Sequence, residues 1–182
     1  MRRFLGAAAC TLSLAAAVAG TSATAASAST IPAGNEHFQF VSVSASSTRY
    51  SAIAWGAFTA GGTINMHSGL VRFPGGTFRA IHHRTSMQSE LNRKTCLLVS
   101  IGHGTYKLAH GTGKYRHITG RGTYTSRVWG VLARNARGRC SQSKPPTAFQ
   151  QIINARGPVR GVSRTRVPNW WGSPRQSARR AG

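Results

Sequence analysis

The sequence predicts an all-β fold, specifically a single antiparallel eight-stranded barrel. From His37 onward, apolar and polar residues alternate in short segments, and almost no segment has apolar residues at helical spacing. Clusters of Gly, Pro and Ser separate these segments and are typical of turns, at 46–48, 61–62, 74–76 and 145–146. A length of 182 residues fits one domain. About eight strands are enough to close a barrel, which removes unpaired sheet edges.

Nine segments are candidate strands because each is short, rich in apolar or β-branched residues and bounded by turn residues. In chain order they are 38–44, 52–59, 63–67, 70–72, 77–82, 96–101, 104–108, 122–132 and 148–155. A barrel of about eight strands is either filled by side chains or holds one small ligand. The side chains expected to point inward are Phe38, Phe40, Trp55, Phe58, Phe73, Phe78 and Trp129. The pattern leaves open whether they fill the interior.

The N-terminal segment has the pattern of a secretory signal peptide. Arg2 and Arg3 precede an apolar run over 4–19, and small residues follow it. We expect cleavage after Ala28, with Ala25 as the alternative, and therefore a secreted, extracellular protein. A retained membrane anchor is the competing interpretation, but the run is shorter than the roughly 20 residues that span a bilayer.

The predicted organisation has four parts. They are a signal peptide (1–28), a lead-in (29–36), the barrel domain (37–159) and a disordered tail that contains Arg and Trp (160–182).

The charge is strongly unbalanced. There are 24 Lys and Arg residues against two Glu and no Asp, a formal net charge of +22 that becomes +20 once Arg2 and Arg3 are removed. Two carboxylates cannot supply an EF-hand, a carboxylate-rich di-metal centre or a Ser-His-Asp triad. The positive charge attracts polyanions, although a preference for Arg codons would produce the same composition. Possible polyanion contacts in the tail are Arg164, Arg166, Trp170, Trp171, Arg175, Arg179 and Arg180; the alternative is a solvated extension without a function.

Two of the three cysteines remain after cleavage, because Cys10 lies in the signal segment. Cys96 and Cys140 have only one intramolecular pairing, so we predict a disulfide between them. It would close a loop of about 45 residues and stabilise the fold by roughly 3–4 kcal/mol. A reactive thiol or a zinc ligand pair would need a local CxxC or a patterned His partner, which the sequence lacks.

Gly-x-Gly recurs every nine residues at 102–122, each time followed by Tyr two positions later. We expect these residues to be structural and to shape turns. They are Gly102, Gly104, Tyr106, Gly111, Thr112, Gly113, Tyr115, Gly120, Gly122 and Tyr124.

The same stretch carries a family resemblance. The segments 104–108 (GTYKL) and 111–115 (GTGKY), followed by Ile118-x-Gly120-x-Gly122, resemble the strand and glycine-turn signature of allene oxide cyclase and dirigent barrels. Small secreted actinobacterial relatives of that superfamily are more similar still, since Cys96-Leu97 and the ending Gly-Pro-Val at 157–159 fit their layout. The resemblance covers residues 37–159 and implies an allene oxide cyclase-like barrel.

The sequence departs from that family at several points. His110 and His117 stand where Gly or a small residue is common, and we expect both on turns. The resemblance implies acidic groups around the barrel cavity, but Glu36 is predicted to precede the first strand and Glu90 to lie in a polar loop. No catalytic residue is therefore carried over from the family.

Seven histidines raise the question of a metal site. His103, His110 and His117 are seven residues apart, and an odd spacing along a strand alternates faces, as it does for the adjacent His82 and His83. We therefore expect no metal and no cofactor. Phosphate-loop, dinucleotide, nucleophile-elbow and His-Glu-x-x-His patterns are absent from the sequence.

Three functions follow as hypotheses. The first is a secreted barrel that binds a small apolar or aromatic ligand inside, without acid–base catalysis. The alternative is a cationic surface protein that binds anionic envelope polymers or nucleic acid. A further alternative is an allene oxide cyclase-like isomerase acting without a metal. The sequence identifies neither a ligand-binding residue nor the oligomeric state, and it favours a binding role over an enzymatic one.

Overall fold

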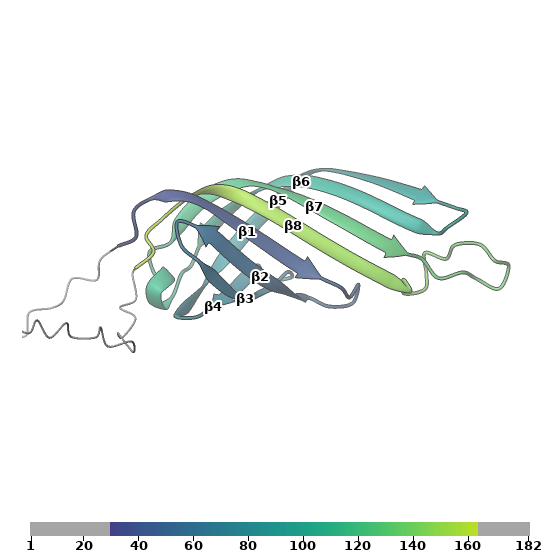
Figure 1. Cartoon of the computed structure of the whole chain (residues 1–182), viewed down its shortest axis with the longest axis horizontal. Coiled ribbons are helices and arrows are strands. Elements are labelled where there is room, and N and C mark those ends of the chain that lie inside the picture. The colour runs from purple at the N-terminus through teal and green to yellow at the C-terminus, as the bar shows by residue number, and fades with distance from the viewer. Residues whose placement is uncertain (1–29, 164–182) are drawn as a thin grey trace, which may run out of the picture.

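The computed structural model describes residues 30–163, so the predicted signal peptide and all the tail contacts named above lie outside the described residues. One eight-stranded antiparallel sheet closes in a ring in which each strand pairs with its neighbour in sequence and β1 pairs with β8 (Figure 1). The strands are β1 (Gly34–Ser42), β2 (Arg49–Gly56), β3 (Ala60–Asn65), β4 (Leu70–Phe73), β5 (Gly76–Asn92), β6 (Leu97–Ala109), β7 (Thr119–Val131) and β8 (Ala148–Arg160). The all-β prediction and the count of eight strands are confirmed.

The ring has eight strands where nine segments were expected, because 96–101 and 104–108 belong to one strand, β6. Gly102 and Gly104 were predicted to form a turn, but they pair in register with Ser126 and Tyr124 of β7. A glycine in a strand interior leaves room for a large side chain on the neighbouring strand. The two glycines therefore do not interrupt the strand with a turn; they lie within β6 and leave space for side chains of β7.

Strand β5 is longer than expected and continues through Glu90, which was predicted to lie in a loop. Residues 81–90 are all exposed, so no alternation of apolar and polar residues marks this part of the strand. Its pairing with β6, from Arg79–Ala109 to Asn92–Leu97, forms the strand without help from burial. Sequence periodicity detects half-buried strands and does not detect a strand solvated on both faces.

Two of the predicted inward side chains point outward. Trp55 follows the fully buried Ala54 on β2 and is 42% exposed, so it lies on the outer face. Trp129 pairs with Val99 and lies between Val128, which lines the interior, and the buried Gly130. Since successive residues of a strand face opposite sides, both tryptophans are outside the ring. The other five, Phe38, Phe40, Phe58, Phe73 and Phe78, are buried as predicted.

The ring is lopsided, which decides where it is filled. Strands β5 to β8 have 13 to 17 residues, whereas β2, β3 and β4 have eight, six and four. The long strands therefore extend well past the short ones at one end of the molecule (Figure 1). We call this the open end, and the opposite end, where β1 begins and β8 finishes, the closed end.

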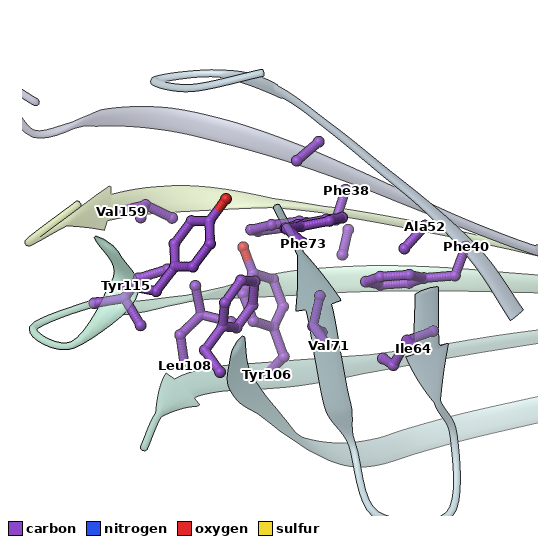
Figure 2. Packing of buried hydrophobic residues seen from close by; sticks show 14 of the residues in the cluster. Phe38, Phe40, Ala52, Ile64, Val71, Phe73, Tyr106, Leu108, Tyr115 and Val159 are labelled. Atoms are coloured by element: carbon purple, nitrogen blue, oxygen red, sulfur yellow. The ribbon is translucent and has the colours of Figure 1, made fainter. Parts of the chain in front are cut away.

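A short 3-10 helix, η1 (Gly113–Tyr115), lies at the closed end of the ring. Its Lys114 N–H donates to Gly75 O at 2.8 Å, and Ser163 N–H donates to Lys114 O at 2.9 Å. These bonds insert the fully buried Tyr115 ring among Phe58, Phe73 and Phe78, with ring centroids 5.3 to 6.2 Å apart. Figure 2 shows Tyr115 within this aromatic cluster. No helix within the described residues is long and apolar enough to cross a membrane.

The predicted disulfide between Cys96 and Cys140 is confirmed, with Cα atoms 5.3 Å apart and 44 residues of separation. It joins the turn between β5 and β6 to the loop between β7 and β8. Leu132 N–H also donates to Cys96 O at 2.9 Å, which holds the same two segments together. The bond therefore constrains the open end, where core contacts are fewest.

Candidate functional site: a cavity in the open half of the barrel

A cavity of about 400 Å³ occupies the half of the ring toward the open end. Its floor is formed by Phe38, Phe78 and Tyr106, which separate it from the filled closed half. The walls come from six of the eight strands and include Phe40, Ile64, Met66, Ala80, Met87, Leu108, Tyr124, Val128, Ile153 and Ala155. The question left open by the sequence thus has a mixed answer, because one half of the barrel is packed and the other is hollow.

Three polar side chains of the cavity wall, Ser100, Ser126 and Gln151, have hydrogen-bond partners within the protein. Gln151 Nε2 donates to Ser126 Oγ at 2.9 Å, and Tyr50 donates its hydroxyl to Gln151 Oε1 at 2.6 Å. The hydroxyls of Ser100 and Ser89 are 2.8 Å apart. These contacts satisfy the hydrogen bonds of this part of the wall, and most of the other lining residues are apolar.

Two tyrosines of the cavity lining each face a glycine across β6 and β7. Tyr106 is directly opposite Gly122, and Tyr124 is directly opposite Gly104. A Cβ atom on Gly122 would lie 2.8 Å from Cε1 of Tyr106, and one on Gly104 would lie 2.5 Å from the Tyr124 ring. Each aromatic ring therefore lies over the glycine opposite it, and both tyrosine side chains stay on the inner face of the sheet.

The remaining motif residues are on a turn, as predicted. Thr112 accepts a hydrogen bond from Thr77 N–H on its Oγ1 at 3.0 Å, and Gly113 has a φ of 56°. Gly120, in contrast, lies inside β7, where a turn was expected, and Gly122 lies in the same strand. The repeat in the sequence thus corresponds to two different uses of glycine, one at a turn and one beneath an aromatic ring.

A buried carboxyl group lies beneath the floor of the cavity. Glu36 was predicted to precede the first strand, but it lies within β1 and is fully buried on the inward face. Its Oε2 accepts a hydrogen bond from Phe58 N–H at 2.9 Å, while its Oε1 has no partner. Burial raises the pKa of this carboxyl from 4.5 to about 7, against the backbone N–H groups of Phe58, His37 and Ala57, which lower it.

Two tyrosine hydroxyls share this environment. The hydroxyls of Tyr106 and Tyr115 are buried and without hydrogen-bond partners (Figure 2). Burial, and secondarily the charge of Glu36, raise the pKa of Tyr106 to about 12 and the pKa of Tyr115 further. Glu36 does not line the cavity, since the floor intervenes. This position supports a structural role for Glu36.

The histidines do not converge. His82 is on the inward face, with its ring edge-on to Tyr124 at 6.2 Å, and both His82 and His83 border the cavity. His103 lies on β6, with Nδ1 3.3 Å from Thr125 Oγ1. His110, with a φ of 55°, and His117 lie on turns, as predicted. Within residues 30–163, no three His, Cys, Asp or Glu side chains are grouped as metal ligands would be.

A second depression, which we call the outer groove, lies on the outside of the ring over β7, β8, β1 and β2. It has a volume of about 450 Å³. Its side chains are His37, Trp55, Thr123, Thr125, Arg127, Asn154 and Arg156. His37 pairs with both Trp55 and Arg156 across the strands, and its ring stacks on Trp55 with centroids 5.5 Å apart and planes 9° apart. The groove combines an aromatic platform with two cations.

Comparisons with known proteins found no matching family model, no matching curated protein and no matching solved structure. The resemblance to allene oxide cyclase and dirigent barrels therefore stays a prediction.

Sequence reasoning missed two residues that the structure brings into prominence. Arg84, on β5, borders the cavity at the open end, and Glu36 lies in the interior. The alternation from Glu36 through Phe38 to Phe40 was a usable signal for Glu36, since it places all three on one face. No local signal marked Arg84, because residues 81–90 show no alternation of apolar and polar residues that would assign it to the inward face.

Proposed function

We propose that the protein binds a small apolar or aromatic molecule in the cavity of its open half. The observation that carries this proposal is the hollow itself, since about 400 Å³ lies within the usual range of 300–1,000 Å³ for ligand pockets. Folded interiors normally pack to the density of organic crystals, and this half of the barrel does not. Transfer of an apolar ligand surface from water into the cavity is favourable by roughly 25 cal/mol per Å².

The shape of the barrel supports a binding role. The floor is made of large, fully packed aromatic side chains, and the disulfide holds the open end. Gln151 and Ser126 are already paired within the wall, so a ligand that covers them leaves their hydrogen bonds in place. The site is therefore largely preformed, which lowers the entropic cost of binding.

Native mass spectrometry of the full chain, compared with its denatured mass, tests the proposal together with titration of the fluorescent probe N-phenyl-1-naphthylamine. We expect a non-covalent adduct or saturable uptake of the probe. Gly102→Phe should abolish uptake, because a Cβ at Gly102 meets nothing closer than 3.5 Å and the ring would enter the cavity. Ile101→Phe, on the exposed outer face one residue away, should not.

Ser126→Phe, from the facing strand, provides a second blocking variant if Gly102→Phe does not fold. A clean apo mass together with no uptake of the probe by the wild-type protein would refute the proposal. So would equal uptake by a folded blocking variant and the wild type.

A second candidate function is binding of an anionic glycan, and the outer groove favours it. Trp55 is 42% exposed although its ring is large and apolar, and Arg127 and Arg156 are exposed near it. Aromatic platforms stack on sugar rings, and Thr123, Thr125 and Asn154 add hydroxyl and amide groups that match sugar hydroxyls. The two guanidinium groups would pair with carboxylate or sulfate substituents.

Binding to an immobilised acidic polysaccharide tests this second candidate. We expect Trp55→Ala and Arg156→Gln to weaken binding, whereas Arg72→Gln, an equal loss of charge on the exposed face of β4, should change it much less. Equal effects of all three would show that net charge alone is responsible. Tighter binding to single-stranded DNA than to the polysaccharide would assign the groove to nucleic acid instead.

A further inference from the structure

A bulge in β5 comes directly after Arg84. The register with β6 shifts between Arg84 and Ser86, so the inward face changes from even-numbered to odd-numbered residues. Before the shift, His82 and Arg84 pair with the inward-facing Tyr106 and Gly104. Bulges of this kind redirect a side chain at the rim of a barrel. Arg84 is the last inward residue before the bulge, and it borders the cavity.

The side chain of Arg84 lies over the hollow part of the wall. Its Cδ atom is 4.0 Å from the place where a Cβ on Gly102 would stand. Its Nη1 contacts Met87 Sδ at 3.2 Å, and a thioether is a weak acceptor. The guanidinium also lies close enough to Tyr124 to lower the pKa of that hydroxyl, opposing the effect of burial. The cation is therefore held at the mouth of the cavity by weak contacts.

Neither carboxylate side chain of the protein is placed to neutralise Arg84. Glu36 lies below the cavity floor and bonds to Phe58 N–H. Glu90 pairs with Val99, and it lies on the face of β5 opposite to Ser89, whose hydroxyl meets the cavity-lining Ser100. Among the described residues, the cavity thus has a guanidinium at its mouth and no acid in its lining.

We propose that the ligand is an amphipathic anion, with an apolar or aromatic body in the cavity and one carboxylate or sulfonate group on the Arg84 guanidinium. This inference rests on the proposed ligand-binding function and narrows its chemical class. A guanidinium pairs with such a group through two parallel N–H···O bonds, which a neutral ligand cannot accept in the same way. His82, on the same inward face two residues earlier, lies between this anchor and the aromatic floor.

Two probes that differ only in the anionic group test the inference. They are 8-anilinonaphthalene-1-sulfonate and N-phenyl-1-naphthylamine, titrated by fluorescence into the full chain. We expect the sulfonate to bind more tightly to the wild type. Arg84→Gln should weaken sulfonate binding by about tenfold or more, the loss typical of a hydrogen bond to a charged group, and should leave the neutral probe within about twofold.

The matched control is Arg79→Gln, which removes the same charge from the exposed outer face of β5. This substitution should leave the affinities for both probes unchanged. Gly102→Phe should abolish binding of both probes, and that result would show that the dyes occupy the cavity and not the cationic surface.

The possible failures are distinguishable. The assignment of Arg84 would be overturned if Arg84→Gln lowered the affinity for both probes equally. It would also be overturned if Arg84→Gln and Arg79→Gln lowered the affinity for the sulfonate equally. In either case the cavity would remain a ligand site. If neither probe binds the wild type, the proposed function itself fails. Thermal unfolding of each variant confirms that it is folded under the assay conditions.

Discussion

Tyr106 on β6 lies directly opposite Gly122 on β7, with Cε1 of the ring 2.8 Å from the position that a Cβ on the glycine would occupy. The Tyr106 ring forms part of the cavity floor, and the missing side chain of Gly122 leaves the space that this ring needs. A glycine of the sequence repeat thus makes room for a tyrosine of the cavity floor.

Gly122→Ala should therefore destabilise the protein. Its new Cβ would collide with the carbonyl oxygen of Arg156 and press on Tyr106, and overpacking of this kind costs about 1–3 kcal/mol. Gly61→Ala is the matched control, because a Cβ there has nothing within 4 Å, and its effect should be within about 0.5 kcal/mol. Urea unfolding of both variants measures the difference. Equal stability of the two variants would show that the packing of Tyr106 on Gly122 is not tight.

The buried carboxyl of Glu36 predicts a pH-dependent stability. Its pKa is about 7 in the folded protein against 4.5 for an exposed Glu, so between these pH values the folded state retains a proton that the unfolded state has released. Stability from this group is fully present below pH about 4.5 and is lost as the pH rises through about 7, by roughly 3 kcal/mol in all. Glu36→Gln should remove that loss.

The test for Glu36 compares the free energies of unfolding of the wild type and Glu36→Gln at pH 5 and pH 8. We expect similar values at pH 5 and a more stable Gln variant at pH 8. The exposed histidines are common to both proteins, so their contribution cancels in the comparison. Parallel pH profiles would contradict the burial of an ionisable Glu36 beneath the floor.

Two buried tyrosines should respond oppositely to loss of the hydroxyl. The Tyr115 hydroxyl has no partner, so Tyr115→Phe should be neutral or stabilising. The Tyr50 hydroxyl donates to Gln151 Oε1 at 2.6 Å, so Tyr50→Phe should cost about 1 kcal/mol. Thermal unfolding of the two variants under one condition gives the comparison. Loss of more than about 1 kcal/mol in Tyr115→Phe would mean that its hydroxyl has a partner, such as Glu36 or a water molecule.

The disulfide should contribute substantially to stability. Replacing Cys96 and Cys140 together by Ala opens a loop with 44 residues of separation, which the chain-entropy relation converts to about 3–4 kcal/mol. Denaturant unfolding measures the loss, and thiol labelling of the unreduced wild type should detect no reaction at Cys96 or Cys140. Because the bond lies at the open end, hydrogen exchange should rise most in the tips of β5 and β6. A uniform rise over all strands would show instead that the bond acts on the whole fold.

The sequence by itself determined the all-β class, the disulfide partners and the inward positions of five phenylalanines. These features depend on local alternation and on the presence of only two cysteines beyond the predicted signal segment, and both can be read without knowing the fold. The sequence did not indicate the strand over 83–90, where polar and apolar residues do not alternate.

Tertiary structure alone decided which half of the barrel is empty and which charged groups face it. The outward direction of Trp55 depends on the register of β2 with its two neighbours, and the inward direction of Arg84 depends on the pairing of β5 with β6. The hollow lies where four long strands extend past three short ones, so few side chains from β2 to β4 are available to fill the space beside β5 to β8. Each of these is a relation between segments far apart in the chain, and a local pattern cannot encode it.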